Sequence, residues 1–156
     1  MTASASIAMQ AHSVPRYAID IGLADVAVVF AQSILLELPY GANRCPLPGA
    51  PAWWRGAINH RGFVVPRFDI ARWLNRDDNG ERIEVIVDSA PHSTAWLLPA
   101  APELLQLHSP GVPPMPDGVP LQLRPYVSEV WMSDSGDVIE LNHRRLLAEL
   151  GRSVQR

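Results

Sequence analysis

Short runs of β-branched, aromatic and aliphatic residues recur along the chain, and turn-forming residues separate them. Six runs have the length and composition of β-strands: residues 17–21, 26–30, 57–59, 63–65, 82–88 and 94–98. Two of these runs flank a His-Arg-Gly connection in which Gly62 can adopt a positive φ, so the pattern predicts a hairpin. We therefore expect an all-β protein with short helices.

Two other segments have the pattern of short helices. Asp69 and Asn142 are good N-cap residues, and each precedes a segment that ends in Trp-Leu or Leu-Leu. The second helix is more clearly marked because leucines line one of its faces. Gly151 occupies the position expected of the residue just beyond its C-terminus.

The same pattern occurs twice along the chain. When the sequence is aligned with itself, segment 28–38 falls on segment 97–107, and segment 65–74 falls on segment 138–147. The offset of the second alignment is larger than that of the first, so the second copy carries an insertion. The insertion must lie in the Pro- and Gly-rich loop 107–124, where extra residues are easily accommodated.

A single copy of about 65 residues would bury little apolar surface, so we expect the two copies to pack on each other. The predicted architecture is two pseudo-symmetric small five-stranded β-barrels in one domain over residues 16–150, with a groove between them. The first unit is expected at about 16–76 and the second at about 82–150. Residues 1–15 are expected to form a flexible, polar N-terminal tail.

The composition is that of a globular protein, with 47% hydrophobic and 19% charged residues. The longest apolar stretch, residues 26–38, is interrupted by Gln32 and Glu37 and is shorter than the roughly 20 residues needed to cross a bilayer. The N-terminus lacks the pattern of an export signal, and the single cysteine cannot form an internal disulfide. We therefore expect a cytoplasmic protein without direct membrane insertion.

The residues that usually carry catalysis are sparse. Five histidines are scattered without the spacing of a metal site, and Cys45 has no partner thiol. The catalytic motifs GxSxG and HExxH and a phosphate-binding loop do not occur, and the chain has no lysine. Asp77 and Asp78 belong to a turn-forming segment that we interpret as a solvated loop. We predict no catalytic residue, no metal and no cofactor, and therefore no enzyme.

Charge is unevenly distributed in a chain with a formal net charge of -3, because residues 55–76 hold five arginines and one acid, with aromatic residues between them. In one interpretation the aromatics, including Trp54 and Phe68, are buried in a barrel with a solvated basic face. A second interpretation is single-stranded nucleic-acid binding, which the sequence pI of about 5.9 disfavours. A third is a protein partner, because arginine and tryptophan are enriched in interface hot spots and Arg61 lies at the predicted hairpin tip.

The segment "PLPGAPAWWRGAINHRGFVVPRFDI" resembles the central signature of CheW-like domains. The matching positions are Pro48, Pro51, Trp54, Gly56, Ile58, Asn59, Arg61, Gly62, Pro66, Asp69 and Ile70. Upstream "SILLEL" and downstream "VIELNHRRLL" also resemble segments of this family. The resemblance covers about residues 16–150 and is weakest between 83 and 130.

The resemblance implies two five-stranded barrels related by a pseudo-twofold axis, which act as an adaptor without catalysis. Such domains couple the cytoplasmic tip of chemoreceptors to the regulatory domain of a CheA-type histidine kinase, through barrel edges and the groove between barrels. Nucleic acid is not among the implied partners. By motif position, the expected partner-binding residues are Glu37, Gly56, Asn59, Arg61 and Gly62.

Several positions depart from the family pattern, so the chain resembles a divergent member. His60 stands where an apolar residue is usual, Arg67 where valine or isoleucine is preferred, and Glu129 where glycine is usual. Pro99 replaces a typical aspartate of the second unit. These departures leave open the partner of the second unit and the behaviour controlled, which is swimming, twitching driven by type IV pili or another output.

Overall fold

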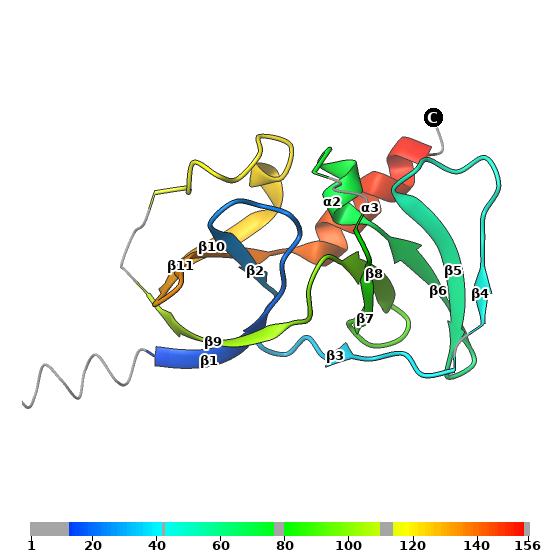
Figure 1. Cartoon of the computed structure of the whole chain (residues 1–156), viewed down its shortest axis with the longest axis horizontal. Helices are drawn as coiled ribbons and strands as arrows, with labels where there is room; N and C mark the ends of the chain where they lie inside the picture. The colour runs from blue at the N-terminus through cyan, green and yellow to red at the C-terminus, as the bar shows by residue number, and fades with distance from the viewer. Residues whose placement is uncertain (1–12, 42, 77–79, 110–113, 155–156) are drawn as a thin grey trace, which may run out of the picture.

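The computed structural model describes residues 13–41, 43–76, 80–109 and 114–154 (Figure 1). The strands are β1 (Ser13–Ala18), β2 (Val26–Val29), β3 (Leu36–Glu37), β4 (Arg44–Cys45), β5 (Trp54–His60), β6 (Phe63–Phe68), β7 (Ile83–Val87), β8 (Thr94–Leu98), β9 (Glu103–His108), β10 (Val127–Ser133) and β11 (Gly136–Leu141). The helices are α2 (Ile70–Trp73), the 3-10 helix η1 (Arg124–Tyr126) and α3 (His143–Val154). The expected tail lies outside the described residues, except that residues 13–15 begin β1.

The strands form two sheets, with the orders β1-β9-β10-β11-β2 and β3-β7-β8-β6-β5-β4. A bridge between Ile19 and Val28, with N···O distances of 2.7 and 3.0 Å, joins the two edges of the first sheet. In the described part of the chain, no pairing joins β3 to β4 at the edges of the second sheet. The mostly β architecture with two sheets and two helices is confirmed, whereas closure into barrels is not.

The sheets do not follow the expected units. The first sheet combines β1 and β2 of the first sequence copy with β9, β10 and β11 of the second copy, and β3–β8 form the other sheet. In Figure 1 the chain crosses from one sheet to the other between β2 and β3 and returns between β8 and β9. The expectation that segments 16–76 and 82–150 are separate barrels is therefore wrong, because each copy contributes strands to both sheets.

The alignment of segment 65–74 with segment 138–147 is nevertheless visible in the hairpins. In β5–β6, Trp54 is paired with Phe68, and at the corresponding positions of β10–β11, Val127 is paired with Leu141. A register irregularity follows the first residue of each pair. The sequence repeat thus corresponds to a repeated hairpin, although the two copies exchange partners in the sheets.

Both predicted helix caps are present. The side chain of Asp69 accepts a hydrogen bond from Arg72 N at 3.1 Å, and that of Asn142 accepts one from Arg145 N at 3.2 Å. The expected end of the second helix at Gly151 is wrong, because α3 continues to Val154. An exposed glycine in the last turn costs only about 1 kcal/mol relative to alanine, so it does not have to end the helix.

One large core cluster joins the two sheets and both helices. Ile19, which follows β1, and Phe30, which follows β2, belong to the same cluster as Trp96 of the second sheet and Leu146 of α3. Phe68 is buried, as predicted, whereas Trp54 is only half-buried against it. Two smaller clusters lie within the individual sheets, and the one in the second sheet consists of Ile58, Val65, Ile86 and Ala95.

Candidate functional site

The tip of the β5–β6 hairpin is a tight turn. His60 is paired with Phe63, and the φ angles of Arg61 and Gly62 between them are 52° and 82°. Positive φ at both central positions is the geometry that matches the twist of a hairpin. The hairpin and the positive φ of Gly62 were predicted from the sequence, whereas the positive φ of Arg61 was not.

Arg61 forms an ion pair with Glu37, which β3 brings to the hairpin from another edge of the same sheet. Glu37 Oε1 also lies 3.4 Å from His60 Nε2. The side chain of Arg61 is 74% exposed, so the pair adds little to stability. The structure thus brings together two of the residues chosen from the motif and leaves the guanidinium accessible from solvent.

Gly56 and Asn59 lie elsewhere on the hairpin. Gly56 has a φ of 90°, and a Cβ atom at this position would lie 2.1 Å from the carbonyl oxygen of Cys45. Gly56 is therefore buried against β4 and shapes the edge without being accessible itself. Asn59 is exposed, and its backbone N–H donates to Asn43 O at 3.2 Å.

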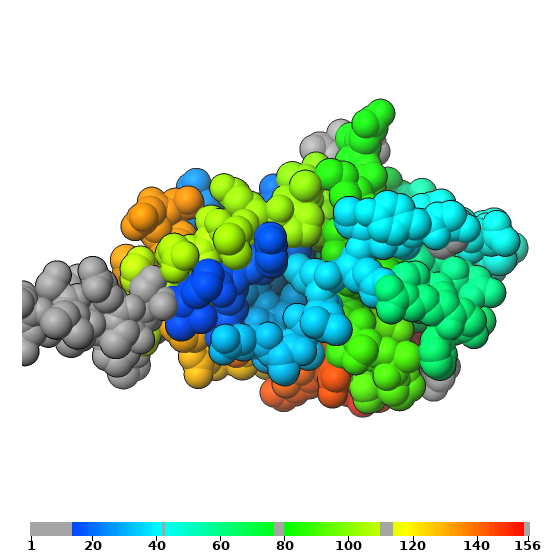
Figure 2. All heavy atoms as spheres, turned by 90° about the horizontal axis from the view of Figure 1, so that it is seen from below, coloured from blue at the N-terminus to red at the C-terminus, as the bar shows by residue number. Residues whose placement is uncertain are grey.

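Apolar side chains surround this hairpin tip on the surface. Phe63 is 52% exposed and Val64 is 80% exposed. Near Glu37, Leu38 and Tyr40 are exposed as well. Figure 2 shows the face on which β1, the segment around β3 and the hairpin reach the surface. We call Glu37, Arg61, Phe63 and Val64 the hairpin surface. The sequence analysis did not use Phe63 and Val64, although apolar residues next to a predicted hairpin tip indicate a contact surface.

A groove of about 500 Å³ adjoins the hairpin surface. Glu37 lines it on one side, and the other lining residues are apolar or aromatic: Tyr17, Leu36, Leu38, Ile83, Val85, Ala101 and Pro102. Tyr17 belongs to β1 of the first sheet, whereas β3 and β7 of the second sheet supply most of the other lining residues. The connection between β8 and β9 completes the lining, so the groove lies between the two sheets. A groove in this place was expected from the resemblance.

Apart from Phe63 at the hairpin tip, the aromatic residues interleaved with the arginines do not form an exposed stacking surface. Trp53, Trp54 and Trp73 are partly buried and pack against the large core cluster, to which Phe68 belongs. Binding of single-stranded nucleic acid depends on exposed aromatic faces on which bases can stack. Their placement supports the interpretation that these aromatics stabilise the fold.

A buried polar cluster connects β7 to α3. Asp88 Oδ2 lies 2.8 Å from His143 Nε2 and accepts a bond of 2.7 Å from Arg144 Nε. Burial alone would raise the pKa of Asp88, but the bonds from Arg144 and His143 outweigh it and hold that pKa well below its ordinary value. Burial lowers the pKa of His143, although Asp88 opposes this effect. The sequence analysis predicted only a helix after Asn142 here and missed this cluster.

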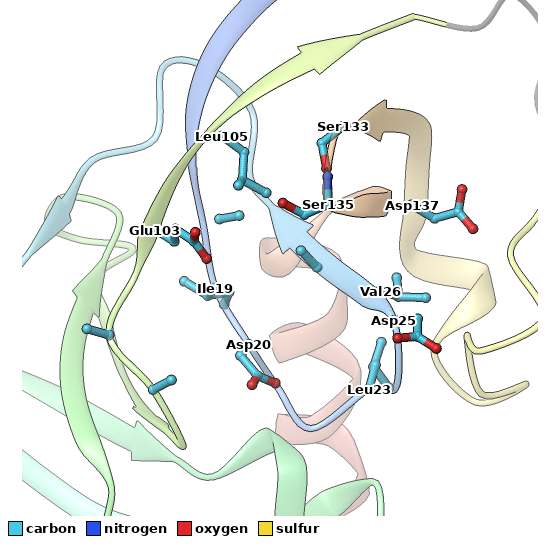
Figure 3. Close-up of a pocket in the computed structure, with 14 residues that line it drawn as sticks. Ile19, Asp20, Leu23, Asp25, Val26, Glu103, Leu105, Ser133, Ser135 and Asp137 are labelled. Atoms are coloured by element: carbon cyan, nitrogen blue, oxygen red, sulfur yellow. Dashed lines mark hydrogen bonds between the residues drawn. The ribbon is translucent and has the colours of Figure 1, made fainter.

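A cavity of about 350 Å³ opens beside the first sheet (Figure 3). Four carboxylates line it, those of Asp20, Asp25, Glu103 and Asp137. Within the described ranges, however, no three His, Cys, Asp or Glu side chains are grouped so that they could hold a metal ion.

Among the helices of the described residues, none is long and apolar enough to span a membrane.

Comparisons with known proteins agree with this fold. The model of the CheW-like domain family matches residues 38–150, which is more than half of the chain. The chain therefore belongs to the CheW-like domain family, whose members are non-catalytic scaffolds, and it is not an enzyme. Its fold is similar to that of the scaffolding protein TtCheW from Thermoanaerobacter tengcongensis, with a TM-score of 0.57 and 17% identity over 82% of this chain and 89% of that one. Among curated proteins, no sequence match was found.

Proposed function

We propose that this chain is a coupling adaptor that connects the cytoplasmic tip of a chemoreceptor to the CheW-like regulatory domain of a CheA-type histidine kinase. Membership of a family of scaffolds supports a role in assembling signalling proteins. The observation that carries the proposal is the exposed Arg61–Glu37 pair, which lies between exposed apolar side chains and an apolar groove. A charged pair with apolar neighbours is the composition of a protein–protein contact.

The two surfaces suit different partners. The groove between the sheets is lined by apolar side chains and can accept the apolar face of a helix, such as those of a receptor tip. The hairpin surface instead presents Glu37 of the edge strand β3 and a guanidinium, which suit the β-structure of a kinase regulatory domain. We therefore assign the receptor to the groove and the kinase to the hairpin surface.

Two variants test this assignment, and each serves as the control of the other. Arg61→Glu places a negative charge beside Glu37, and we expect it to weaken kinase-domain binding by more than about tenfold, the loss of one charge-assisted contact. Ile83→Asp places a charge in the groove and should weaken receptor binding in the same way. Binding of each purified partner is measured by calorimetry.

Each variant should retain the affinity for the partner that it does not contact. Since Arg61 is exposed, the melting temperature of Arg61→Glu should stay within a few degrees of the unmodified protein. The double variant Glu37→Arg/Arg61→Glu keeps an ion pair but removes the guanidinium from position 61. If the double variant binds the kinase as weakly as Arg61→Glu does, the loss is due to the guanidinium and not to the broken ion pair. Kinase binding that is unchanged in Arg61→Glu would contradict the assignment.

We extend the proposal to twitching motility driven by type IV pili, because His60 and Arg67 depart from the family pattern within the segment that carries the hairpin. A strain that lacks the chain should lose directed twitching and keep directed swimming. The opposite result would assign the chain to swimming.

A further inference from the structure

The arginines of segment 55–76 are not explained by the hairpin surface, to which only Arg61 belongs. Three others, Arg55, Arg67 and Arg72, line one cavity of about 440 Å³, to which Arg44 and Arg82 also contribute. We call this cavity the arginine pocket. It spans adjacent strands of the second sheet and the first turn after Asp69, so residues that are distant in the sequence form its wall.

The arginine pocket continues the face of the second sheet that carries its small core cluster. Arg67 lies two residues after the buried Val65 on β6, and Glu84 lies two residues before the buried Ile86 on β7. Alternate residues of a strand share a face, so both side chains lie on the face of the small core cluster. Their side chains are only 15% and 8% exposed, which places this part of the pocket largely out of water.

Two carboxylates hold three of the arginines in position. Glu84 Oε2 lies 3.2 Å from Arg44 Nε and 3.2 Å from Arg67 Nη2. Asp69 Oδ2 lies 3.3 Å from Arg82 Nε, while Oδ1 of the same carboxylate caps α2. Each carboxylate is therefore shared between donors and cannot neutralise all the positive charge around it.

Positive charge exceeds negative charge in the arginine pocket. Five arginines and two acids line it among the described residues. Arg55 is exposed, and its guanidinium has no hydrogen bond or ion pair with the described residues. An exposed guanidinium at the mouth of a basic cavity can accept an anion from solvent.

The first sheet shows that the fold does not require these arginines. In the alignment of the two hairpins, Arg55 corresponds to Ser128 and Arg67 corresponds to Glu140. Ser128 Oγ donates to Glu140 Oε2 at 3.2 Å. Glu140 also forms an ion pair with Arg16 of β1, an edge strand of the first sheet. The equivalent positions are thus satisfied by a hydroxyl and a carboxylate, so stability alone does not explain the basic pocket.

We propose that the arginine pocket binds a compact anion with more than one phosphate group. The planar guanidinium group can donate two parallel hydrogen bonds to phosphate oxygens, and these bonds are strengthened where water is largely excluded. Among the described lining residues, Leu97 is the one large apolar side chain, so the pocket offers no wall for a base or an acyl chain. The recognised part of the ligand is therefore the phosphate groups themselves.

Calorimetric titration of the full chain with pyrophosphate at low ionic strength tests the proposal. We expect one saturable site, and Arg55→Ser, which copies the residue at the equivalent position of the first sheet, should weaken it by about tenfold. Arg152→Ser on α3 is the matched control, because Arg152 is an exposed arginine that does not line the pocket. The proposal is overturned if the unmodified chain shows no saturable binding, or if the two variants weaken binding equally.

Further ligands and variants establish which chemistry is recognised. Citrate has several carboxylates but no phosphate, and citrate binding as tight as that of pyrophosphate would overturn the phosphate assignment. Oligothymidylate should bind more weakly than pyrophosphate, because the nearby aromatics pack against the core. Arg61→Glu should leave pyrophosphate binding unchanged, so failure of the arginine pocket and failure of the proposed adaptor function are distinguishable.

Discussion

At the scale of single residues, two glycines of the signature segment differ in why they are glycine. Gly56 has a positive φ and also faces the backbone of Cys45, so both its conformation and the lack of space exclude a side chain. Gly62 has a positive φ, but a Cβ atom at its position would meet no neighbouring atom within 4 Å. The first glycine is therefore required for packing of β4 on β5, and the second for the turn alone.

This difference predicts different losses of stability. Gly62→Ala should lower the free energy of unfolding by about 1 kcal/mol through backbone strain, and Gly56→Ala by about 2 kcal/mol or more because a backbone contact must also open. Urea unfolding of both variants measures the two values. Equal losses would contradict the close approach between Gly56 and Cys45.

At the scale of elements, the polar cluster of Asp88, His143 and Arg144 attaches the start of α3 to the end of β7. His143 also packs edge to face against Phe30, with ring centroids 5.0 Å apart, so the imidazole is enclosed by apolar and polar neighbours. Burial lowers its pKa below 6.5, and the charges that act on it are those of Asp88, Arg144 and His92.

The lowered pKa of His143 predicts a stability that decreases in mild acid. The unfolded chain takes up a proton near pH 6.5 that the folded chain resists, so the contribution of neutral His143 is present above pH 6.5 and is lost as the pH falls below it. Asp88 stays ionised in this range because its folded pKa is lowered. Urea unfolding at about pH 7.5 and about pH 5.5 measures the change. His143→Gln should show a smaller decrease, and an equal decrease would assign the effect to other histidines.

At the scale of the whole molecule, the two sequence copies are not independent folding units. In the first copy, β1 and β2 lack their neighbours β9 and β11, which belong to the second copy. In the second copy, β7 and β8 lack their neighbours β3 and β6, which belong to the first copy. Strand edges without partners and a divided core leave each copy with too little buried surface. The fold therefore depends on both halves of the chain.

This arrangement predicts the behaviour of fragments. Fragments 1–80 and 81–156 should each lack a cooperative thermal transition when studied alone by circular dichroism. An equimolar mixture should recover such a transition, because the exchanged strands can then pair. A cooperative transition in either fragment alone would contradict the dependence of each sheet on both copies.

The predictions from sequence succeeded where the signal is local. The hairpin at Gly62 and the caps at Asp69 and Asn142 follow from turn and cap chemistry within a few residues, and the structure confirms them. The contact between Asp88 and His143 joins residues 55 positions apart, and no local pattern indicates it. Gly151 shows the reverse error, because a local stop signal did not end α3, which continues to Val154 at the small cost of an exposed glycine.

The sequence by itself indicated two helices and six strand segments, which overlap β1, β2, β5, β6, β7 and β8, because alternation, turn residues and caps act over short distances. It did not indicate β3, β4, β9, β10 and β11 as separate strands. It also determined the duplicated pattern and the family resemblance. Only the tertiary structure decided which copy each strand pairs with, because an alternating strand can add to either sheet and the crossings near residues 30–35 and 99–102 select one pairing. The same long-range packing brought Arg61 to Glu37 and gathered five arginines around one cavity, since side chains far apart in the chain meet only when the sheets have formed.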